Sequence, residues 1–406
     1  MRQLFNFNKK RNLEPKEIYL DNSATTQVDD RVLEAMLPYF KQDYGNASSS
    51  HAFGKKAKQA LEASREAIAK AINAEKSEIY FTSGGTESNN LALKGLFFSN
   101  YPRKNHIITT KIEHASVINV CKWLEKQGAQ ITYLNVDSQG FVDLKQLEKS
   151  INRKTIAVSI IHANNEIGTI QDLKTIGEIC KTRGVLFHTD ACQSFTKSFI
   201  DVKQQDIDLM TLNAHKIHGP KGIGALYARK GVEKIIVPIQ HGGGHEMGLR
   251  SGTENVAGAV GFAKAVEIAN SLDVQRMSDL RDKLIKGVLE IPGIKLNGPK
   301  DSKKRLCNNA SFIFQEIDGE AVGEYLQGEG IYTSTGSACL SHSQEPNHVL
   351  LALGCSLEDV GNAIRISLSR YTSEKDIDKV LETLPKVIKR IKEIESAFKT
   401  KKCTTK

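Results

Sequence analysis

The chain has 406 residues and 40% hydrophobic content, which is enough for one large domain and one smaller domain, each with its own core. No run approaches the roughly 18–20 consecutive apolar residues that span a bilayer. The first ten residues carry charge without an apolar core, so we expect neither a membrane protein nor a secreted one. The net charge of +9 comes from dispersed lysines without interleaved aromatic residues, which favours a solvated surface over direct binding to nucleic acid.

The cysteines are scattered along the chain without a Cys-x-x-Cys pair. This odd, unpatterned set argues against a disulfide framework and against structural zinc, so no metal site is predicted. It indicates a reducing compartment, and we expect a cytoplasmic protein. The seven cysteines stand at positions 121, 180, 192, 307, 339, 355 and 403.

In chain order, segments with helical spacing alternate with short apolar segments typical of buried strands. Lys55–Asn73 places Ala57, Leu61 and Ile68 on one face of a helix. Further helices are expected through Glu87–Phe98, from Ala115 and from Leu173. This alternation predicts an α/β fold with a mainly parallel sheet and helices on both faces. The expected strands are Glu78–Thr82, His106–Thr110, Thr155–Ile161, Val185–His188, Ile207–Leu212 and Ile223–Ala228.

The character of the sequence changes after about residue 260, where long helical stretches flank the apolar segment Ala310–Phe314. A last helix is expected over Lys375–Phe398. We therefore interpret residues 21–258 as a large domain. Residues 1–20 together with 259–406 are interpreted as a smaller α+β domain.

Two strand ends carry residues suited to a cofactor. Residues 83–88 read Ser-Gly-Gly-Thr-Glu-Ser, and a glycine pair before a helix lets backbone N–H groups approach an anion. A plain helix-starting turn is an equal alternative. Asp190 ends another strand, with Gln193 one turn later, and its carboxylate could keep a pyridinium nitrogen protonated. The alternative for Asp190 is an N-cap for the next helix.

A lysine and a histidine stand in two further strand-end loops. Lys216 follows a buried strand in a Gly/Pro-rich turn, where desolvation would lower its pKa and make it an amine nucleophile. Lys221 is a rival for that role, and a surface lysine is the alternative for both. His114 lies in the loop Lys-Ile-Glu-His, where its ring could face a cofactor ring.

Cys339 lies in the small, polar segment Gly-Ser-Ala-Cys-Leu-Ser-His. A thiol on such a loop can be exposed and reactive, whereas buried cysteines are usually inert packing. Cys121, beside Trp123 on an amphipathic helix, is interpreted as packing. Cys192 is expected to be a small buried residue near the cofactor.

Taken together, these motifs make the chain resemble the cysteine desulfurases of the class-V aminotransferase-like pyridoxal-phosphate (PLP) family, in the branch that feeds iron–sulfur cluster assembly and tRNA thiolation. The resemblance covers nearly the whole chain, from the motif Tyr-Leu-Asp (19–21) to the last helix. It rests on the order and spacing of motifs that read Ser-Ala-Thr-Thr (23–26), His-Ala-Asn-Asn-Glu-Ile-Gly (162–168), His-Lys-Ile-His-Gly-Pro-Lys-Gly (215–222), Arg-Ser-Gly-Thr (250–253) and Gly-Ser-Ala-Cys (336–339).

The resemblance implies the aspartate-aminotransferase type of fold (PLP fold type I), with a seven-stranded sheet in the large domain, and a homodimer. It makes Lys216 the Schiff-base lysine, Asp190 the partner of the pyridine nitrogen and His114 the residue that stacks on the ring. It places Asn165 and Gln193 at the ring oxygen or nearby groups. It implies that the phosphate of the cofactor is bound by Gly85, Thr86, Asn213 and His215, together with Thr253 of the neighbouring subunit.

The implied reaction removes sulfur from L-cysteine and leaves L-alanine and a persulfide on Cys339. Lys216 takes the Cα proton, His114 moves the proton of the substrate thiol, and Arg365 anchors the substrate carboxylate with help from Asn165. An iron–sulfur scaffold or another sulfur acceptor is a possible partner. The sequence departs from the family pattern at Asn213, usually serine, and at Gly85, usually alanine.

Two other functions stay open at this point. One is a different PLP enzyme on the same fold, such as a selenocysteine lyase or an aminotransferase. The other is a non-catalytic sulfur-relay protein that kept the fold; the presence of Lys216 and Asp190 argues against it.

Overall fold

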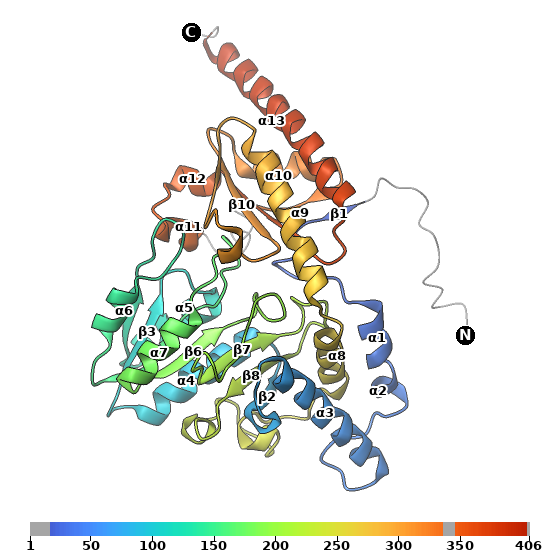
Figure 1. Cartoon of the computed structure of the whole chain (residues 1–406), viewed down its shortest axis with the longest axis vertical. Helices are drawn as coiled ribbons and strands as arrows, with labels where there is room; N and C mark the ends of the chain where they lie inside the picture. Colours follow the sequence, from blue (N-terminus) through green and yellow to red (C-terminus); the bar gives the residue numbers. More distant parts are fainter. Residues whose placement is uncertain (1–16, 336–345, 404–406) are drawn as a thin grey trace.

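The computed structural model describes residues 17–335 and 346–403. Figure 1 shows a larger body around a central sheet and a smaller body above it, from which the last helix projects. No helix in these described ranges is both long and apolar enough to cross a membrane.

A seven-stranded sheet forms the centre of the larger body, in the order β2-β8-β7-β6-β5-β3-β4. Strand β8 is antiparallel to its neighbours β2 and β7, and the other pairs are parallel. The predicted mainly parallel, seven-stranded sheet is thereby confirmed. The strands are β2 (Ile79–Thr82), β3 (His106–Thr110), β4 (Gln130–Leu134), β5 (Thr155–Ser159), β6 (Leu186–Asp190), β7 (Leu209–Asn213) and β8 (Gly224–Ala228).

Alternate residues of these strands enter two separate cores, because successive side chains of a strand point to opposite faces. Ile79 and Phe81 pack in the core that α3 and α8 cover, whereas Tyr80 packs in the core of α4 and α5. Helices therefore cover both faces of the sheet, as predicted. They are α1 (Asp30–Met36), α2 (Pro38–Lys41), α3 (Ala52–Ala71), α4 (Gly85–Asn100), α5 (Ala115–Glu125), α6 (Leu144–Ser150), α7 (Leu173–Arg183) and α8 (Val256–Glu267).

The strand that the apolar pattern did not reveal is β4, at one edge of the sheet. Most of its residues are partly exposed, and they mix polar with apolar types. An edge strand of this kind lacks the continuous apolar run that marks the buried strands.

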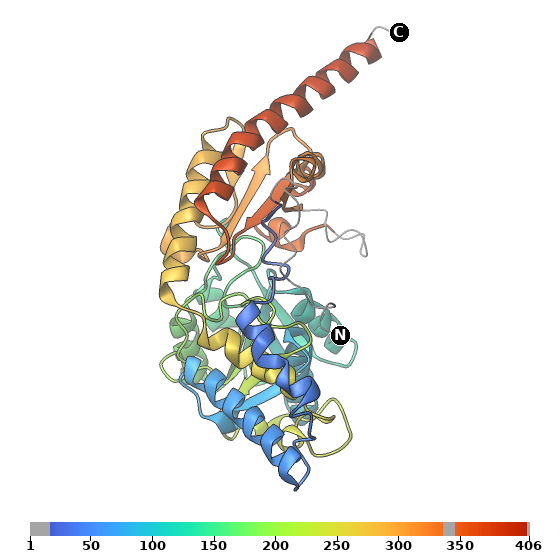
Figure 2. The ribbon, with the colours of Figure 1, turned by 90° about the vertical axis from the view of Figure 1, so that its right-hand side faces the viewer.

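The smaller body contains a four-stranded antiparallel sheet in the order β12-β13-β10-β9. Helices α9 and α13 lie side by side against it, as Figures 1 and 2 show. The N-terminal strand β1 (Ile18–Tyr19) joins this body by pairing with β11 (Ile331–Tyr332). Its elements are β9 (Ile294–Leu296), β10 (Asn309–Phe314), β12 (Ser334–Thr335), β13 (Ala363–Ser367), α9 (Ser271–Leu289), α10 (Gly319–Gly328), α11 (His348–Ala352), α12 (Leu357–Gly361) and α13 (Glu374–Cys403).

Helix α8 spans the interpreted domain boundary at residue 258. Ala259, Phe262 and Ala265 lie in the same core cluster as Leu61 of α3, so the part of α8 beyond residue 258 also packs within the large-domain core. We therefore propose a large domain that ends after α8, and a small domain that takes in the N-terminal strand and the chain from α9 onward.

Candidate active site

Loops at the carboxyl ends of the large-domain strands meet the small domain around one cavity of about 380 Å³. Parallel strands end at the same edge of a sheet, which is why residues far apart in sequence converge there. Ten of the residues predicted from the sequence line it, namely Gly85, Thr86, His114, Asn165, Asp190, Gln193, Asn213, His215, Lys216 and Arg365.

Two predicted residues are not placed in this cavity. Thr253 is exposed in the irregular segment before α8 and is not among the lining residues. Cys339 falls outside the described residues, so its predicted position at the site stays a prediction.

Lys216 enters the cavity just after β7. Its ammonium group donates to the carbonyl oxygens of Ser23 and Ala24, at 2.6 Å from the latter. Burial, and then the positive charge of Arg365, lower the pKa of Lys216 to about 8. A substantial fraction of this amine is therefore neutral at mildly alkaline pH, as a nucleophilic amine must be. Its sequence rival Lys221 is exposed and lines a neighbouring cavity instead.

Asp190 stands at the end of β6 with its carboxylate buried at the cavity wall. The side-chain amide of Asn89 donates to Oδ2 at 2.7 Å, and the backbone N–H of Cys192 donates to Oδ1 at 2.9 Å. These contacts fix the carboxylate at the cavity wall. The alternative interpretation of Asp190 as the N-cap of a helix is wrong, because turns and no helix follow β6 before β7. Asp190 instead offers a buried carboxylate to the cavity.

The ring of His114 lines the cavity, and its Nδ1 is fixed by contacts with Ser116. Nδ1 accepts from the backbone N–H of Ser116 at 3.1 Å and lies 2.7 Å from the Ser116 hydroxyl. These contacts cap α5 and leave Nε2 to face a ligand. Desolvation by the surrounding protein lowers the pKa of His114, so the ring is neutral at neutral pH.

The opposite end of the cavity meets the N-terminus of α4, where the first helical residue is Gly85. Backbone N–H groups there have no side-chain cap from the N-cap residue Gly84 and suit an anion. Nearby, Oδ1 of Asn213 and Oε1 of Gln193 are buried without a hydrogen-bond partner among the described residues. Burial and neighbouring lysines lower the pKa of His215 to about 4, so it lines this end as a neutral ring.

Arg365 closes the cavity from strand β13 of the small domain. Its Nη2 pairs with Oδ1 of Asp21 at 2.9 Å, and its Nη1 pairs with Oε1 of Glu166 at 2.6 Å. Sequence reasoning singled out neither acidic residue as part of the site. The only signal was that both stand inside motifs of the family resemblance, Tyr-Leu-Asp (19–21) and Asn-Asn-Glu (164–166).

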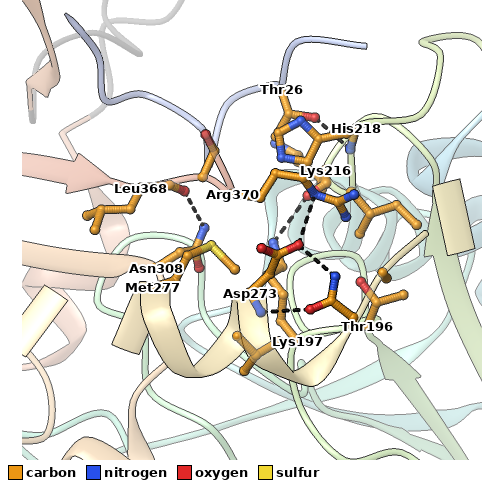
Figure 3. A pocket seen from close by; sticks show the side chains of 15 residues that line it. Thr26, Thr196, Lys197, Lys216, His218, Asp273, Met277, Asn308, Leu368 and Arg370 are labelled. Carbon is orange, nitrogen blue, oxygen red and sulfur yellow. Dashed lines mark hydrogen bonds and ion pairs between the residues drawn. The ribbon is translucent and has the colours of Figure 1, made fainter. Parts of the chain in front are cut away.

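A second cavity adjoins Lys216 and is lined by another half-buried lysine, Lys197 (Figure 3). Its volume of about 30 Å³ leaves room for water but not for an amino acid or a cofactor. The ammonium group of Lys197 donates to the backbone carbonyl oxygen of Lys216 at 3.3 Å. Arg370 and Asp273 line the same cavity and lie 3.9 Å apart. This small cavity therefore does not hold a substrate. The side chain of Lys197 in it stabilises the turn that contains Lys216.

The donor set of the large cavity fits pyridoxal phosphate. It offers a buried amine for the aldehyde, a buried carboxylate for the pyridine nitrogen, a neutral histidine ring for stacking and a helix N-terminus for the phosphate. The unpartnered oxygens of Asn213 and Gln193 are further groups that a polar ligand would satisfy.

Comparison with known proteins gives a consistent result. The profile of the family described as aminotransferase class-V matches residues 18–380. The chain is 49% identical over 383 residues to cysteine desulfurase IscS of Clostridium botulinum, covering 93% of this chain and 96% of that one. The solved structure titled NifS-like protein has a TM-score of 0.86 at 41% identity, covering 92% of this chain and all of the other. A structure titled SspA in complex with cysteine has a TM-score of 0.79 at 38% identity, covering 88% of this chain and all of the other.

Proposed function

Since the chain belongs to the class-V aminotransferase family, and within it to the PLP-dependent cysteine desulfurases, we propose that the cavity around Lys216 is its active site and that L-cysteine is its substrate. The observation that carries this proposal is one amine of lowered pKa, Lys216, in the same cavity as a buried carboxylate, a neutral histidine and an arginine. L-Cysteine is converted there to L-alanine, and the sulfur passes to Cys339 as a persulfide.

Three residues of the cavity take part in the chemistry of the proposed reaction. Pyridoxal phosphate, when bound, supplies an electron-withdrawing ring that weakens the Cα–H bond of the amino acid. Lys216 holds the cofactor covalently and takes the Cα proton, for which a pKa of about 8 is well matched. Asp190 keeps the pyridine nitrogen protonated. His114 stacks on the ring and, being neutral, moves the proton of the substrate thiol through Nε2.

The remaining residues bind and orient. Arg365 takes the substrate carboxylate, which suits a planar guanidinium. The phosphate is held by Gly85, Thr86, Asn213 and His215 at the N-terminus of α4. Asn165 and Gln193 contact the ring oxygen or its neighbours.

The quaternary and cellular setting is part of the same proposal. The chain forms a homodimer in which Thr253 reaches the phosphate of the neighbouring subunit. The exposed side chain of Thr253, which does not line its own cavity, supports this. The name of the similar IscS protein supports a sulfur acceptor in iron–sulfur cluster assembly or tRNA thiolation. Five described cysteines are free, which supports a reducing cytoplasm.

A purified holoenzyme tests the assignment. With L-cysteine it should form L-alanine and a protein persulfide, and K216A should lose the visible absorbance band of the lysine-bound cofactor. K221A, the matched control, should keep that band. C339S should keep the band and bind L-cysteine but should form no persulfide. A keto-acid product, or normal turnover in C339S, would point to an aminotransferase or another PLP enzyme instead.

A further inference from the structure

The carboxylate of Glu166 is paired with the guanidinium group of Arg365. The proposed function assigns the same guanidinium group to the substrate carboxylate. Oε1 of Glu166 lies 2.6 Å from Nη1 of Arg365, and both residues line the main cavity. The other terminal nitrogen of Arg365 is paired with Asp21 at 2.9 Å. Both terminal nitrogens of the guanidinium thus already have a carboxylate partner.

An incoming carboxylate would be the third anion around one buried cation. Arg365 is only 9% exposed, so water screens little of the repulsion between these anions. A bidentate contact also needs two N–H groups of the same guanidinium, and Nη1 is held by Glu166. A substrate carboxylate therefore binds well only when one protein carboxylate moves away.

Glu166 is the carboxylate that can move at low cost. Asn165 donates to its Oε1 at 2.6 Å, and Asn347 lies 3.3 Å from its Oε2, so the side chain keeps two donors after it leaves Arg365. Its backbone is fixed independently, because Oδ1 of Asn164 accepts from the N–H groups of Glu166 and Ile167. Only the side chain has to turn.

We propose that Glu166 competes with the amino-acid carboxylate for Arg365 and thereby sets the affinity of the site for substrate and product. This rests on the proposed function of Arg365 as the carboxylate anchor. Glu166 leaves Arg365 but keeps its contacts with Asn165 and Asn347 when L-cysteine binds, and its return to Arg365 helps to expel L-alanine. The residue limits affinity so that the product does not occupy the site.

The test measures binding of L-alanine and of ethylamine, which is alanine without its carboxylate, through the change in the visible spectrum of the holoenzyme. E166Q keeps the side-chain shape but carries no charge, so it should bind L-alanine about tenfold more tightly, while ethylamine affinity stays within about twofold of the wild type. E324Q, an equal charge change on the exposed face of α10, should alter neither affinity. E166A should act in the same direction as E166Q, and thermal unfolding checks that both variants are folded.

A third variant separates this inference from the proposed function. R365A should weaken L-alanine but not ethylamine, and E166Q should give no gain in the R365A background. If R365A leaves L-alanine affinity unchanged, the carboxylate anchor itself is wrong. If R365A weakens L-alanine and E166Q does not tighten it, or tightens both ligands equally, competition by Glu166 is excluded.

Discussion

The Cβ atom that Gly85 lacks would lie 2.5 Å from the sulfur atom of Cys192. Real side chains do not approach so closely, so an alanine at position 85 requires the thiol of Cys192 or the start of α4 to shift. The amide nitrogen of Asn213 lies 3.7 Å from the same point. The two departures from the family pattern, glycine for alanine and asparagine for serine, therefore meet at one thiol near the N-terminus of α4, where the proposed function places the phosphate.

This relationship predicts a rescue. G85A should weaken binding of pyridoxal phosphate by about tenfold or more, because overpacking costs roughly 1–3 kcal/mol and must displace Cys192 or the helix start. The double variant G85A/C192A should recover most of that affinity, since the methyl group then takes the place of the sulfur. Equilibrium dialysis of the apo-protein measures both, with G361A as control because a Cβ there meets nothing within 4 Å. Additive losses in the double variant would show that the two positions are independent.

A second prediction concerns Lys197, the half-buried lysine beside the turn that contains Lys216. Lys197 donates to the carbonyl oxygen of Lys216, and its positive charge helps to lower the pKa of Lys216. K197M should therefore raise the pKa of Lys216, so that a smaller fraction of its amine is neutral at a given pH. Burial lowers the pKa of Lys197 itself to about 8, which makes the effect largest below that pH, where Lys197 is charged.

The pH dependence of cofactor uptake by the apo-protein measures this effect, since only the neutral amine of Lys216 reacts with the aldehyde. The midpoint should shift upward in K197M and stay near the wild-type value in K197R, which keeps the charge. A loss of uptake at every pH without a shift of the midpoint would mean that Lys197 only supports the local structure.

A third prediction concerns the ion pair between Arg65 of α3 and Glu246. The two side chains are 5% and 2% exposed, and two contacts of 2.7 and 2.9 Å join them. Glu246 also accepts from the backbone N–H of Phe81 at 2.7 Å, which ties the segment around Glu246 to strand β2. E246A leaves Arg65 with Glu62, at 3.3 Å, and the carbonyl oxygen of Ile79 as its partners, and leaves the buried N–H group of Phe81 without its acceptor. The loss of the buried carboxylate should cost about 3 kcal/mol of unfolding free energy.

Urea unfolding of the wild type and the variant checks this cost. E382A removes an exposed helical pair with Lys386 and should leave the urea midpoint unchanged. Equal midpoints for E246A and E382A would show that water reaches Arg65 and replaces the lost partner.

The sequence predicted those parts of the site that depend on a single strand end. Lys216 and Asp190 each follow a buried strand, and the direction of a parallel strand decides on which edge its end lies. Their convergence in one cavity followed from this local pattern. The edge strand β4 was missed because its partly exposed residues carry no continuous apolar signal.

The contacts between the domains could not be predicted in this way. Arg365 is 344 residues from Asp21 and 199 residues from Glu166, and their pairing depends on how the small sheet packs against the large domain. No periodicity in the sequence encodes that geometry. For the same reason, the contact of Lys197 with the backbone of Lys216 appeared only in the folded structure.

A last prediction follows from the buried carboxyl group of Glu113, next to His114 in the chain. Its Oε1 accepts from the Thr110 hydroxyl at 2.7 Å and from the backbone N–H of Ile161 at 2.9 Å, whereas Oε2 is buried without a partner among the described residues. Burial raises the pKa of Glu113 to about 8. In the unfolded chain a glutamate titrates near pH ~4.3, so between these values the folded protein holds a proton that the unfolded chain has lost.

The contribution of Glu113 to the free energy of unfolding should therefore fall as pH rises from about 4.3 to about 8 and then level off, because at this group the folded state binds more protons than the unfolded chain throughout this window. The glutamine of E113Q does not ionise, so the free energy of unfolding of this variant should lack the decrease that Glu113 causes. Its stability relative to the wild type, measured by urea unfolding, should thus increase steadily between about pH 5.5 and about pH 8.5. The buried histidines His162 and His188 are common to both proteins, so their titration cancels in the comparison. A difference between the two proteins that is constant over this range would mean that Glu113 is already ionised in the folded state.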